Sequence, residues 1–549
     1  MKLKLAAALL ASAVAMPAQA DVLVDNVSGI TIDENGEVKR FSALVIDDDG
    51  KVARLLERGE EAPRTDYRED GEGRVMLPGF IDAHGHVSGI GFGALTLDLS
   101  GTNSLEEALE AIRVFAEENE ARPWILGRGW NQEKWGLGRF PTAAELDSVV
   151  SDRPVYLARV DGHAGWANSL AMKAAGVTEK SVSPSGGRIE TLADGKTPSG
   201  VFVDAAEELM TKAIPAPRPV ERDLALAEAQ KVLHAQGITA MADMGTTIED
   251  WQAFRRAGDN GSLTLRIMAY AAGPEQMVLI GGSGPSPWLY DDKLRLNGIK
   301  LYLDGALGSR GAWLKEPYAD DPHNTGLPLT PPAALRNILV RAAQGNFQPA
   351  VHAIGTAANA EALNAISEIA ESFDGDRRWR IEHVQIVDPA DLPKLAEHGI
   401  ISSMQPVHQT SDMFMAEARL GPDRLDGAYA WNTILQLGGR LAFGSDAPVE
   451  SANPFAGLAV AITRANAEGE PFGGWRPSES VSREQALAGF TSEAAFAGFA
   501  EGRFGRLLPG ERADFVLVDV DPLVDTPDQI RNTTVLETWV GGRKVYEAD

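Results

Sequence analysis

The feature that most constrains the fold is a regular alternation of short β-rich runs with amphipathic helical stretches from Ile238 onward. Helical stretches such as 331–345 and 357–372 carry apolar residues at three- and four-residue spacings, the period of a helix with one buried face. Strands separated by helices form parallel sheets, because a parallel connection has to cross over the sheet. The β-rich runs are 238–245, 265–271, 298–305, 348–355, 378–385, 399–406 and 440–448.

An apolar run at 75–84 adds an eighth strand. Eight parallel strands with intervening helices are the number that closes a (β/α)8 barrel of the TIM type. We therefore expect an α/β protein whose barrel spans residues 78–499. An open, doubly wound parallel sheet is the structural alternative.

Three stretches do not fit this repeat. The two ends of the chain, 21–77 and 500–549, contain short alternating strands separated by turn residues, and we expect them to pair as one small β domain. The stretch from about 95 to 220 follows the first barrel strand, so we expect an insertion on the side where barrel loops build active sites.

The first twenty residues predict a secretory signal peptide. Lys2 and Lys4 precede an apolar stretch, and Ala18-Gln19-Ala20 fits a small-residue cleavage site. The stretch is too short for a membrane span, and no other apolar run reaches that length. We expect a periplasmic or secreted protein without a membrane span; an ordinary N-terminal helix is the alternative.

Charge and cysteine content narrow the function classes. The formal charge of −27 argues against nucleic acid as a partner, since phosphate binding needs clustered Lys and Arg. The chain has no Cys, so it has no disulfides, and a metal site would have to use His or carboxylate ligands.

The histidines gather at the predicted strand ends. His84 and His86 close the first strand, and residues two apart on a strand point to the same face, so both imidazoles can converge on one ion. His352, His383 and Asp446 lie near the ends of the fifth, sixth and eighth strands, where a barrel gathers its chemistry. The alternative is that each histidine is a separate core residue with its own hydrogen-bond partner. Burying several polar groups separately costs free energy, which disfavours this alternative. The pattern predicts a metal site.

Lys300 lies inside the fourth predicted strand, in IKLYLDGALGSRGA (299–312). An ammonium beside two divalent cations would be repelled, whereas a carboxylated lysine would supply a bridging carbamate. A lysine that reaches the substrate, or one paired with Asp304, is the ordinary alternative.

The chain resembles the amidohydrolase superfamily, in particular its YtcJ-like and N-substituted formamide deformylase-like (amidohydrolase 3) proteins. The resemblance covers nearly the whole mature chain. It rests on eight motifs in order: PGFIDAHGH (78–86), GRGWNQEKW (127–135), DGHAGWANS (161–169), IKLYLDGALGSRGA (299–312), VHAIG (351–355), RIEHVQ (380–385), SMQPVH (403–408) and FGSDAPVE (443–450).

The resemblance implies a (β/α)8 barrel, a small β-sandwich built from both chain ends, and a divalent metal site, with zinc as the expected metal. It implies that His84, His86 and Asp446 hold the first ion. Lys300, as a carbamate, would bridge to a second ion held by His352 and His383. One departure is Thr356: related sequences commonly read HAIGD where this chain has HAIGT, which puts inherited substrate specificity in doubt.

The predicted chemistry is hydrolysis. A bound metal lowers the pKa of water from about 15.7 to about 7 and polarises a carbonyl. Asp446 is the predicted catalytic group, which takes the proton and returns it to the leaving amine.

Four further residues are candidates for substrate binding. His163 lies in the insertion and His408 follows the seventh strand. Trp130 and Trp166 could wall an apolar or aromatic pocket, or they could pack the insertion.

We therefore expect a metal-dependent hydrolase of C–N bonds in amides or N-acyl and N-formyl amines, with a hydrophobic or aromatic amine half. Lactone or ester hydrolysis on the same metal centre is one alternative, and a non-catalytic periplasmic metal- or ligand-binding protein is another. The expected partners are a small-molecule substrate and a second copy of the chain in a homodimer.

Overall fold

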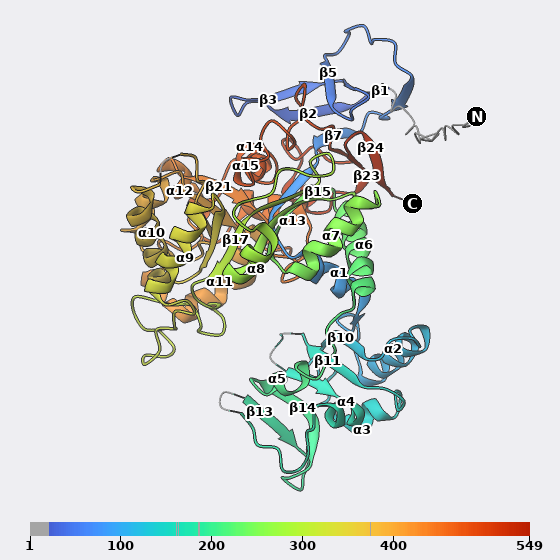
Figure 1. Ribbon diagram of the computed structural model, residues 1–549, viewed down its shortest axis with the longest axis vertical. Helices are drawn as coiled ribbons and strands as arrows, with labels where there is room; N and C mark the ends of the chain where they lie inside the picture. Colours follow the sequence, from blue (N-terminus) through green and yellow to red (C-terminus); the bar gives the residue numbers. More distant parts are fainter. Residues whose placement is uncertain (1–20, 161, 163, 185–186, 374, 549) are drawn as a thin grey trace, which may run out of the picture. The chain divides into compact units, whose positions relative to one another are not determined.

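The computed structural model describes residues 21–548, except 161, 163, 185–186 and 374 (Figure 1). Contacts divide the chain into two compact units. The first comprises residues up to His86 and from Leu233 onward, and the second comprises Val87–Val232. The predicted signal peptide lies outside the described residues.

The first unit contains an eight-stranded parallel sheet. Its strands follow one another in sequence order around the sheet, which confirms the predicted (β/α)8 barrel. They are β8 (Phe80–Gly85), β15 (Ile238–Thr246), β16 (Arg266–Ala272), β17 (Leu294–Tyr302), β18 (Gln348–Ala353), β19 (Arg380–His383), β20 (Ile401–Met404) and β21 (Arg440–Phe443).

The first and last strands meet through the residues that follow them. The backbone nitrogen of Asp446 donates to the carbonyl of His84 at 2.7 Å, and the nitrogen of His86 donates to the carbonyl of Ala447 at 2.9 Å. These bonds join β8 to the segment after β21, so the sheet curls into a nearly closed barrel.

The predicted first strand, 75–84, is two strands with different partners. Residues Val75–Pro78 form β7, which belongs to another sheet, and only β8 enters the barrel. Gly79 lies between them, where a Cβ atom would come within 2.4 Å of the Thr239 side chain. The chain therefore changes sheets at a residue that can have no side chain.

The two chain ends build a small β domain, as predicted. β22 (Phe515–Val518) pairs antiparallel with β7, so the C-terminal and N-terminal segments share one six-stranded sheet. Its order is β24-β23-β22-β7-β2-β3, and a four-stranded sheet has the order β5-β4-β1-β6. The remaining strands are β1 (Val22–Asp25), β2 (Ser28–Ile32), β3 (Val38–Phe41), β4 (Ala43–Ile46), β5 (Val52–Leu56), β6 (Tyr67–Asp70), β23 (Val535–Val540) and β24 (Arg543–Glu547).

Helices of the first unit connect the barrel strands and pack on the outside of the sheet (Figure 1). The predicted helices at 331–345 and 357–372 are α9 (Pro332–Gln344) and α10 (Thr356–Ala370), and α9 buries Leu335, Leu339, Ala342 and Ala343 along one face. The others are α7 (Ile248–Asp259), α8 (Gly273–Gly281), α11 (Pro406–Leu420), α12 (Trp431–Gln436), α13 (Pro454–Thr463), α14 (Arg483–Gly489), α15 (Ser492–Ala497) and α16 (Pro527–Arg531), with 3-10 turns η1 (Leu392–Ala396), η2 (Pro422–Arg424) and η3 (Pro477–Glu479).

The second unit has its own sheet and core, and it contains the whole of the predicted insertion. Its six strands have the order β13-β14-β12-β11-β10-β9. They are β9 (Leu97–Asp98), β10 (Ile125–Trp130), β11 (Val155–Arg159), β12 (Ala164–Ala167), β13 (Gly187–Thr191) and β14 (Pro198–Asp204). The helices are α1 (Val87–Leu95), α2 (Leu105–Glu118), α3 (Ala143–Asp147), α4 (Ser169–Ala174), α5 (Glu207–Thr211) and α6 (Pro219–Ala235), whose last turn enters the first unit.

Within the described part of the chain, every helix is either too short or too polar to span a bilayer.

Candidate metal centre

The predicted ligands come together at the carboxyl end of the barrel. His84 ends β8, and Lys300 lies near the end of β17, with its Nζ 3.1 Å from Nε2 of His84. The ring of His383 lies 4.7 Å from that of His84 and 4.4 Å from that of His352, centroid to centroid. Residues up to 299 positions apart in the sequence therefore line one small space.

Three of these residues could hold one ion. His84, His383 and Asp446 each offer a ligand atom, and these atoms all lie within 4.8 Å of one another. His86 joins the group through Asp446, because its Nε2 lies 3.0 Å from Oδ1 of that carboxylate.

The backbone is strained where two of these side chains leave their strands. His383 has a φ angle of +75° and Asp446 one of +61°, a left-handed conformation that residues with a side chain rarely adopt. Such conformations persist only where the surrounding structure imposes them, and they cluster at functional sites. Here each turn ends a strand and directs a candidate ligand into the barrel mouth.

Burial keeps His84, His352 and His383 neutral. It is the main cause that lowers the pKa of His84 to about 4 and that of His352 to about 3, and the nearby Lys300 ammonium adds to both shifts. Burial likewise lowers the pKa of His383 well below its ordinary value. A neutral imidazole keeps the lone pair that a metal ion needs.

Lys300 is buried and its amine is easily deprotonated. Burial lowers its pKa to about 8, although Glu382 and Asp446 act in the opposite direction. The alternative pairing with Asp304 is not formed. The Asp304 carboxylate instead accepts hydrogen bonds from the backbone nitrogens of Trp313, Ile354 and Gly355 at 2.8–3.0 Å.

Asp446 is anionic at neutral pH. Burial would raise its pKa, but the electrostatic interaction with His84 and the hydrogen bond from His86 outweigh burial and hold the pKa below its usual range. Its Oδ2 lies 3.7 Å from Nε2 of His408. The carboxylate therefore faces three imidazoles and can accept a proton from a group among them.

His408 lies in the first turn of α11, beside the predicted ligands. Its ring stacks on that of His383 with centroids 6.0 Å apart and an interplanar angle of 17°. The side-chain amide of Gln385 lies 3.3 Å from Nδ1, so Nδ1 accepts and Nε2 carries the proton. The structure thus places His408 at the site, with an N–H directed toward Asp446.

Two of the other predicted substrate contacts, Trp130 and Trp166, are core residues of the second unit. Trp130 and Trp166 are fully buried in the core of the second unit, with ring centroids 6.2 Å apart. Their indole nitrogens donate to the carbonyls of Leu157 and Thr142. This is the packing role named above as the alternative, and no surface of either ring is left for a substrate. His163 lies outside the described residues.

Polar residues beneath the ligands were missed by the sequence analysis. Glu382 contacts Nδ1 of His84 at 2.7 Å, and Gln405 contacts Nδ1 of His383 at 2.9 Å. Their positions carried a signal, because Arg380 and Glu382 alternate along β19 and residues two apart share a face. Charged side chains that face the interior of a barrel need buried partners, so this pair indicates a polar network inside the barrel.

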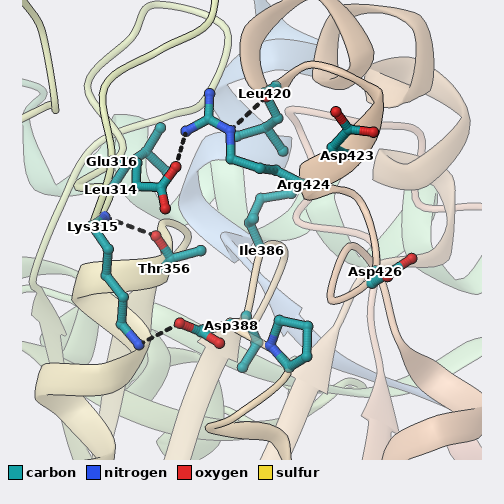
Figure 2. Close-up of a pocket in the computed structure, with 12 residues that line it drawn as sticks. Leu314, Lys315, Glu316, Thr356, Ile386, Asp388, Leu420, Asp423, Arg424 and Asp426 are labelled. Atoms are coloured by element: carbon teal, nitrogen blue, oxygen red, sulfur yellow. Dashed lines mark hydrogen bonds and ion pairs between the residues drawn. The ribbon is translucent and has the colours of Figure 1, made fainter.

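A hollow of about 200 Å3 lies among the segments that follow β17, β18, β19 and α11 (Figure 2). Lys315 spans it: its backbone nitrogen donates to Oγ1 of Thr356 at 2.9 Å, and its Nζ contacts Asp388 at 2.7 Å. The predicted ligands are not among the residues that line this hollow. Thr356 therefore braces a neighbouring loop rather than the metal centre.

The residues present fit a divalent metal. Among the described residues, Nε2 of His352 is buried without a hydrogen-bond partner, which is costly unless another group uses it. Nδ1 of His84 and Nδ1 of His383 already have hydrogen-bond partners, so a metal would bind at Nε2, which in His84 faces Nζ of Lys300 at 3.1 Å. Imidazoles with a carboxylate form the donor set that zinc prefers when Cys is absent.

Comparison with known proteins agrees with this geometry. Residues 69–546 match the sequence model of the amidohydrolase family. The chain is 32% identical to the putative amidohydrolase YtcJ of Bacillus subtilis, over 86% of this chain and 89% of that protein. It is 27% identical to the N-substituted formamide deformylase of Arthrobacter pascens, over 89% of this chain and 91% of that protein.

The fold also matches a solved structure. An uncharacterized metal-dependent hydrolase from Pyrococcus horikoshii superposes with a TM-score of 0.77 and 25% identity, over 92% of this chain and 99% of that chain.

Proposed function

The chain belongs to the amidohydrolase family, and from that premise we propose that it hydrolyses the C–N bond of an amide or an N-acyl or N-formyl amine. The observation that carries the proposal is the convergence of His84, His383 and Asp446 within 4.8 Å at the barrel mouth. The similarity to a deformylase of N-substituted formamides supports the choice of bond. A hydrophobic or aromatic amine half is part of the proposal.

Zinc is the proposed metal, as two ions. His84, His86 and Asp446 would hold one, and His352 and His383 the other. A divalent ion at this site would lower the pKa of water and polarise the substrate carbonyl.

Lys300 would bridge the two ions as a carbamate. Its low pKa leaves a fraction of the amine neutral at neutral pH. The Nζ lone pair attacks the carbon of carbon dioxide; an N–C bond forms, one C=O bond becomes a C–O⁻ bond, and Nζ releases a proton. The product is an anion in place of a buried cation, which removes the repulsion between Lys300 and the metal ions.

Asp446 is the proposed catalytic residue. Its carboxylate is ionised, lies at the ligand cluster and can take the proton of the attacking water. It then returns that proton to the amine nitrogen as the C–N bond breaks. His408 would donate its Nε2–H to the substrate, which uses a buried donor that otherwise lacks a partner.

We propose export to the periplasm or secretion as the location, on the strength of the basic residues, apolar stretch and Ala-Gln-Ala site in the first twenty residues. The enzyme would act there on a small molecule, as a homodimer.

Purified protein, stripped with chelator and reloaded with zinc, tests the function. N-formyl and N-acyl benzylamines, their methylamine counterparts and the matching benzyl esters are the probes. We expect zinc-dependent release of benzylamine. Cleavage of the esters alone would favour the ester-hydrolase alternative, and binding without turnover by fully loaded protein would favour a non-catalytic binding protein.

A further inference from the structure

An ion pair is buried in the barrel directly below the metal centre. Arg380 and Glu382 lie two residues apart on β19, so both side chains point into the barrel. Their side chains are 0% exposed, and Nε of Arg380 lies 2.8 Å from Oε1 of Glu382. A charged pair this deep is retained only when its other hydrogen-bonding groups are also satisfied.

Arg380 is held from several strands at once. Its guanidinium donates to the carbonyl of Ala83 at 2.7 Å, to Oγ of Ser403 at 3.0 Å and to the hydroxyl of Tyr270 at 3.1 Å. It also contacts the second carboxylate oxygen of Glu382 at 3.1 Å. The position of Glu382 is therefore fixed by β8, β16 and β20 as well as by its own strand.

That second oxygen of Glu382 also faces His84. It lies 2.7 Å from Nδ1 of the imidazole. An ionised carboxylate can only accept hydrogen bonds, so Nδ1 of His84 must carry the proton and Nε2 must carry the lone pair. Nε2 faces Nζ of Lys300 at 3.1 Å and Oδ1 of Asp446 at 3.5 Å. Glu382 thus sets both the tautomer and the direction of the ring.

The second ligand histidine is held by a neutral group. Nδ1 of His383 faces the amide oxygen of Gln405 at 2.9 Å. A carboxylate acceptor makes an imidazole a stronger donor to metal than an amide does, because it stabilises the positive charge that the ring gains. Of these two histidines, His84 is therefore the one whose strength as a ligand depends more on the residue behind it.

We propose that Glu382, held in place by Arg380, is a positioning residue that sets the zinc affinity of the centre through His84. The inference rests on the proposed function, which places a metal ion at His84. The competing explanation is that the pair only stabilises the barrel.

A second buried pair in the same unit provides a matched control. Arg266 and Asp514 are 1% and 2% exposed, and two bonds of 2.5 and 2.8 Å join them. Asp514 contacts the backbone nitrogen of Gly541 rather than a histidine. Removing this pair perturbs stability in a comparable way without touching a candidate ligand.

The experiment measures zinc affinity by chelator competition, using full-length apo-protein. The double variant R380M/E382L replaces the pair with apolar residues, an exchange that buried pairs often tolerate. We expect its zinc dissociation constant to rise about 10–100-fold, the usual cost of losing a group behind a metal ligand. We expect the control R266M/D514L to bind zinc as the wild type does, and H84A to lose the site.

The single variant E382Q serves if the double variant does not fold. Its amide oxygen can still accept the proton of Nδ1, so we expect affinity between that of the wild type and that of R380M/E382L. The visible spectrum of the cobalt-loaded protein should shift in E382Q and stay unchanged in R266M/D514L.

Three results would count against the inference in different ways. A folded R380M/E382L variant, or E382Q in its place, with wild-type zinc affinity and cobalt spectrum would overturn it. An equal loss of zinc affinity in R266M/D514L would show that the effect comes from lower protein stability and not from His84. Wild-type protein that bound no zinc, or bound it independently of His84, would refute the metal centre itself.

Discussion

The carboxylate of Asp446, which follows the last barrel strand, lies 3.0 Å from Nε2 of His86, which follows the first. The two residues are 360 positions apart in the sequence. They meet because backbone bonds between the segments after β8 and β21 close the sheet at this point. The closure of the barrel and the assembly of the candidate site are therefore the same structural event.

Replacing Asp446 should abolish most turnover. An Asp446→Asn variant keeps the shape of the side chain but cannot accept the proton of the attacking water, so we expect kcat to fall about 10²–10⁴-fold or more. Initial rates of amide hydrolysis by zinc-loaded protein measure this. Asp391→Asn is the control, because that buried carboxylate binds Lys315 and Lys394 instead. A variant of Asp446 with near-normal kcat would remove it from the chemistry.

Replacing His408 should weaken catalysis without emptying the site. The His408→Phe variant preserves a ring that can stack on His383 but removes the Nε2–H that faces Asp446. We expect kcat/KM to fall about 10–100-fold, the value of one hydrogen bond to a developing charge, with zinc content unchanged. His323→Phe, at an exposed loop position, should match the wild type. If His408→Phe had the same kcat/KM as His323→Phe, the proposed role of His408 as a donor to the substrate would be contradicted.

Much of the site was predictable because its chemistry follows strand ends. The alternation of strands and helices placed His84, His352, His383 and Asp446 at one edge of a barrel, and the structure brings them together there. The local sequence pattern was enough to predict that these residues meet, because the carboxyl ends of parallel barrel strands lie on the same side.

Other parts depend on contacts that no local pattern records. The run 75–84 is apolar as far as Ile81, and nothing in it except Gly79 marks the change from one sheet to another. Trp130 and Trp166 were equally compatible with a pocket wall and with a core, because aromatic residues suit both. The alternation along β19 places Glu382 on an inward face, but its contact with His84, 298 positions away, is set only by the fold.

Acid should destabilise the first unit through His234. Burial lowers its pKa to about 4, and both ring nitrogens are occupied, by the carbonyl of Ile238 at 3.0 Å and the hydroxyl of Thr264 at 2.9 Å. The unfolded chain, with a His pKa near 6.5, therefore binds more protons between pH 6.5 and pH 4 than the folded chain does. The free energy of unfolding should fall as the pH falls through this window.

The His234→Gln variant isolates this contribution. We expect its unfolding free energy to depend less on pH between 6.5 and 4, by up to an order of about 3 kcal/mol over the window. Urea denaturation at several pH values measures the difference. Parallel curves for wild type and variant would contradict the prediction.

Truncating Trp166 should act on stability. Its ring is fully buried in the core of the second unit and its indole nitrogen donates to Thr142. We expect Trp166→Ala to lower the free energy of unfolding of that unit by about 3–5 kcal/mol, the usual cost of emptying an aromatic site. The rate of limited proteolysis between residues 87 and 232 measures this loss of stability. Unchanged protection together with a raised KM would instead restore the predicted role in substrate binding.

Anomalous diffraction at the zinc edge, from crystals of zinc-loaded protein, would locate the metal ions themselves. We expect zinc peaks about 2.0–2.1 Å from imidazole nitrogens of His84, His86, His352 and His383 and about 2.0–2.2 Å from an oxygen of Asp446. A fully loaded protein whose zinc peaks lay away from these five side chains would contradict the proposed metal centre.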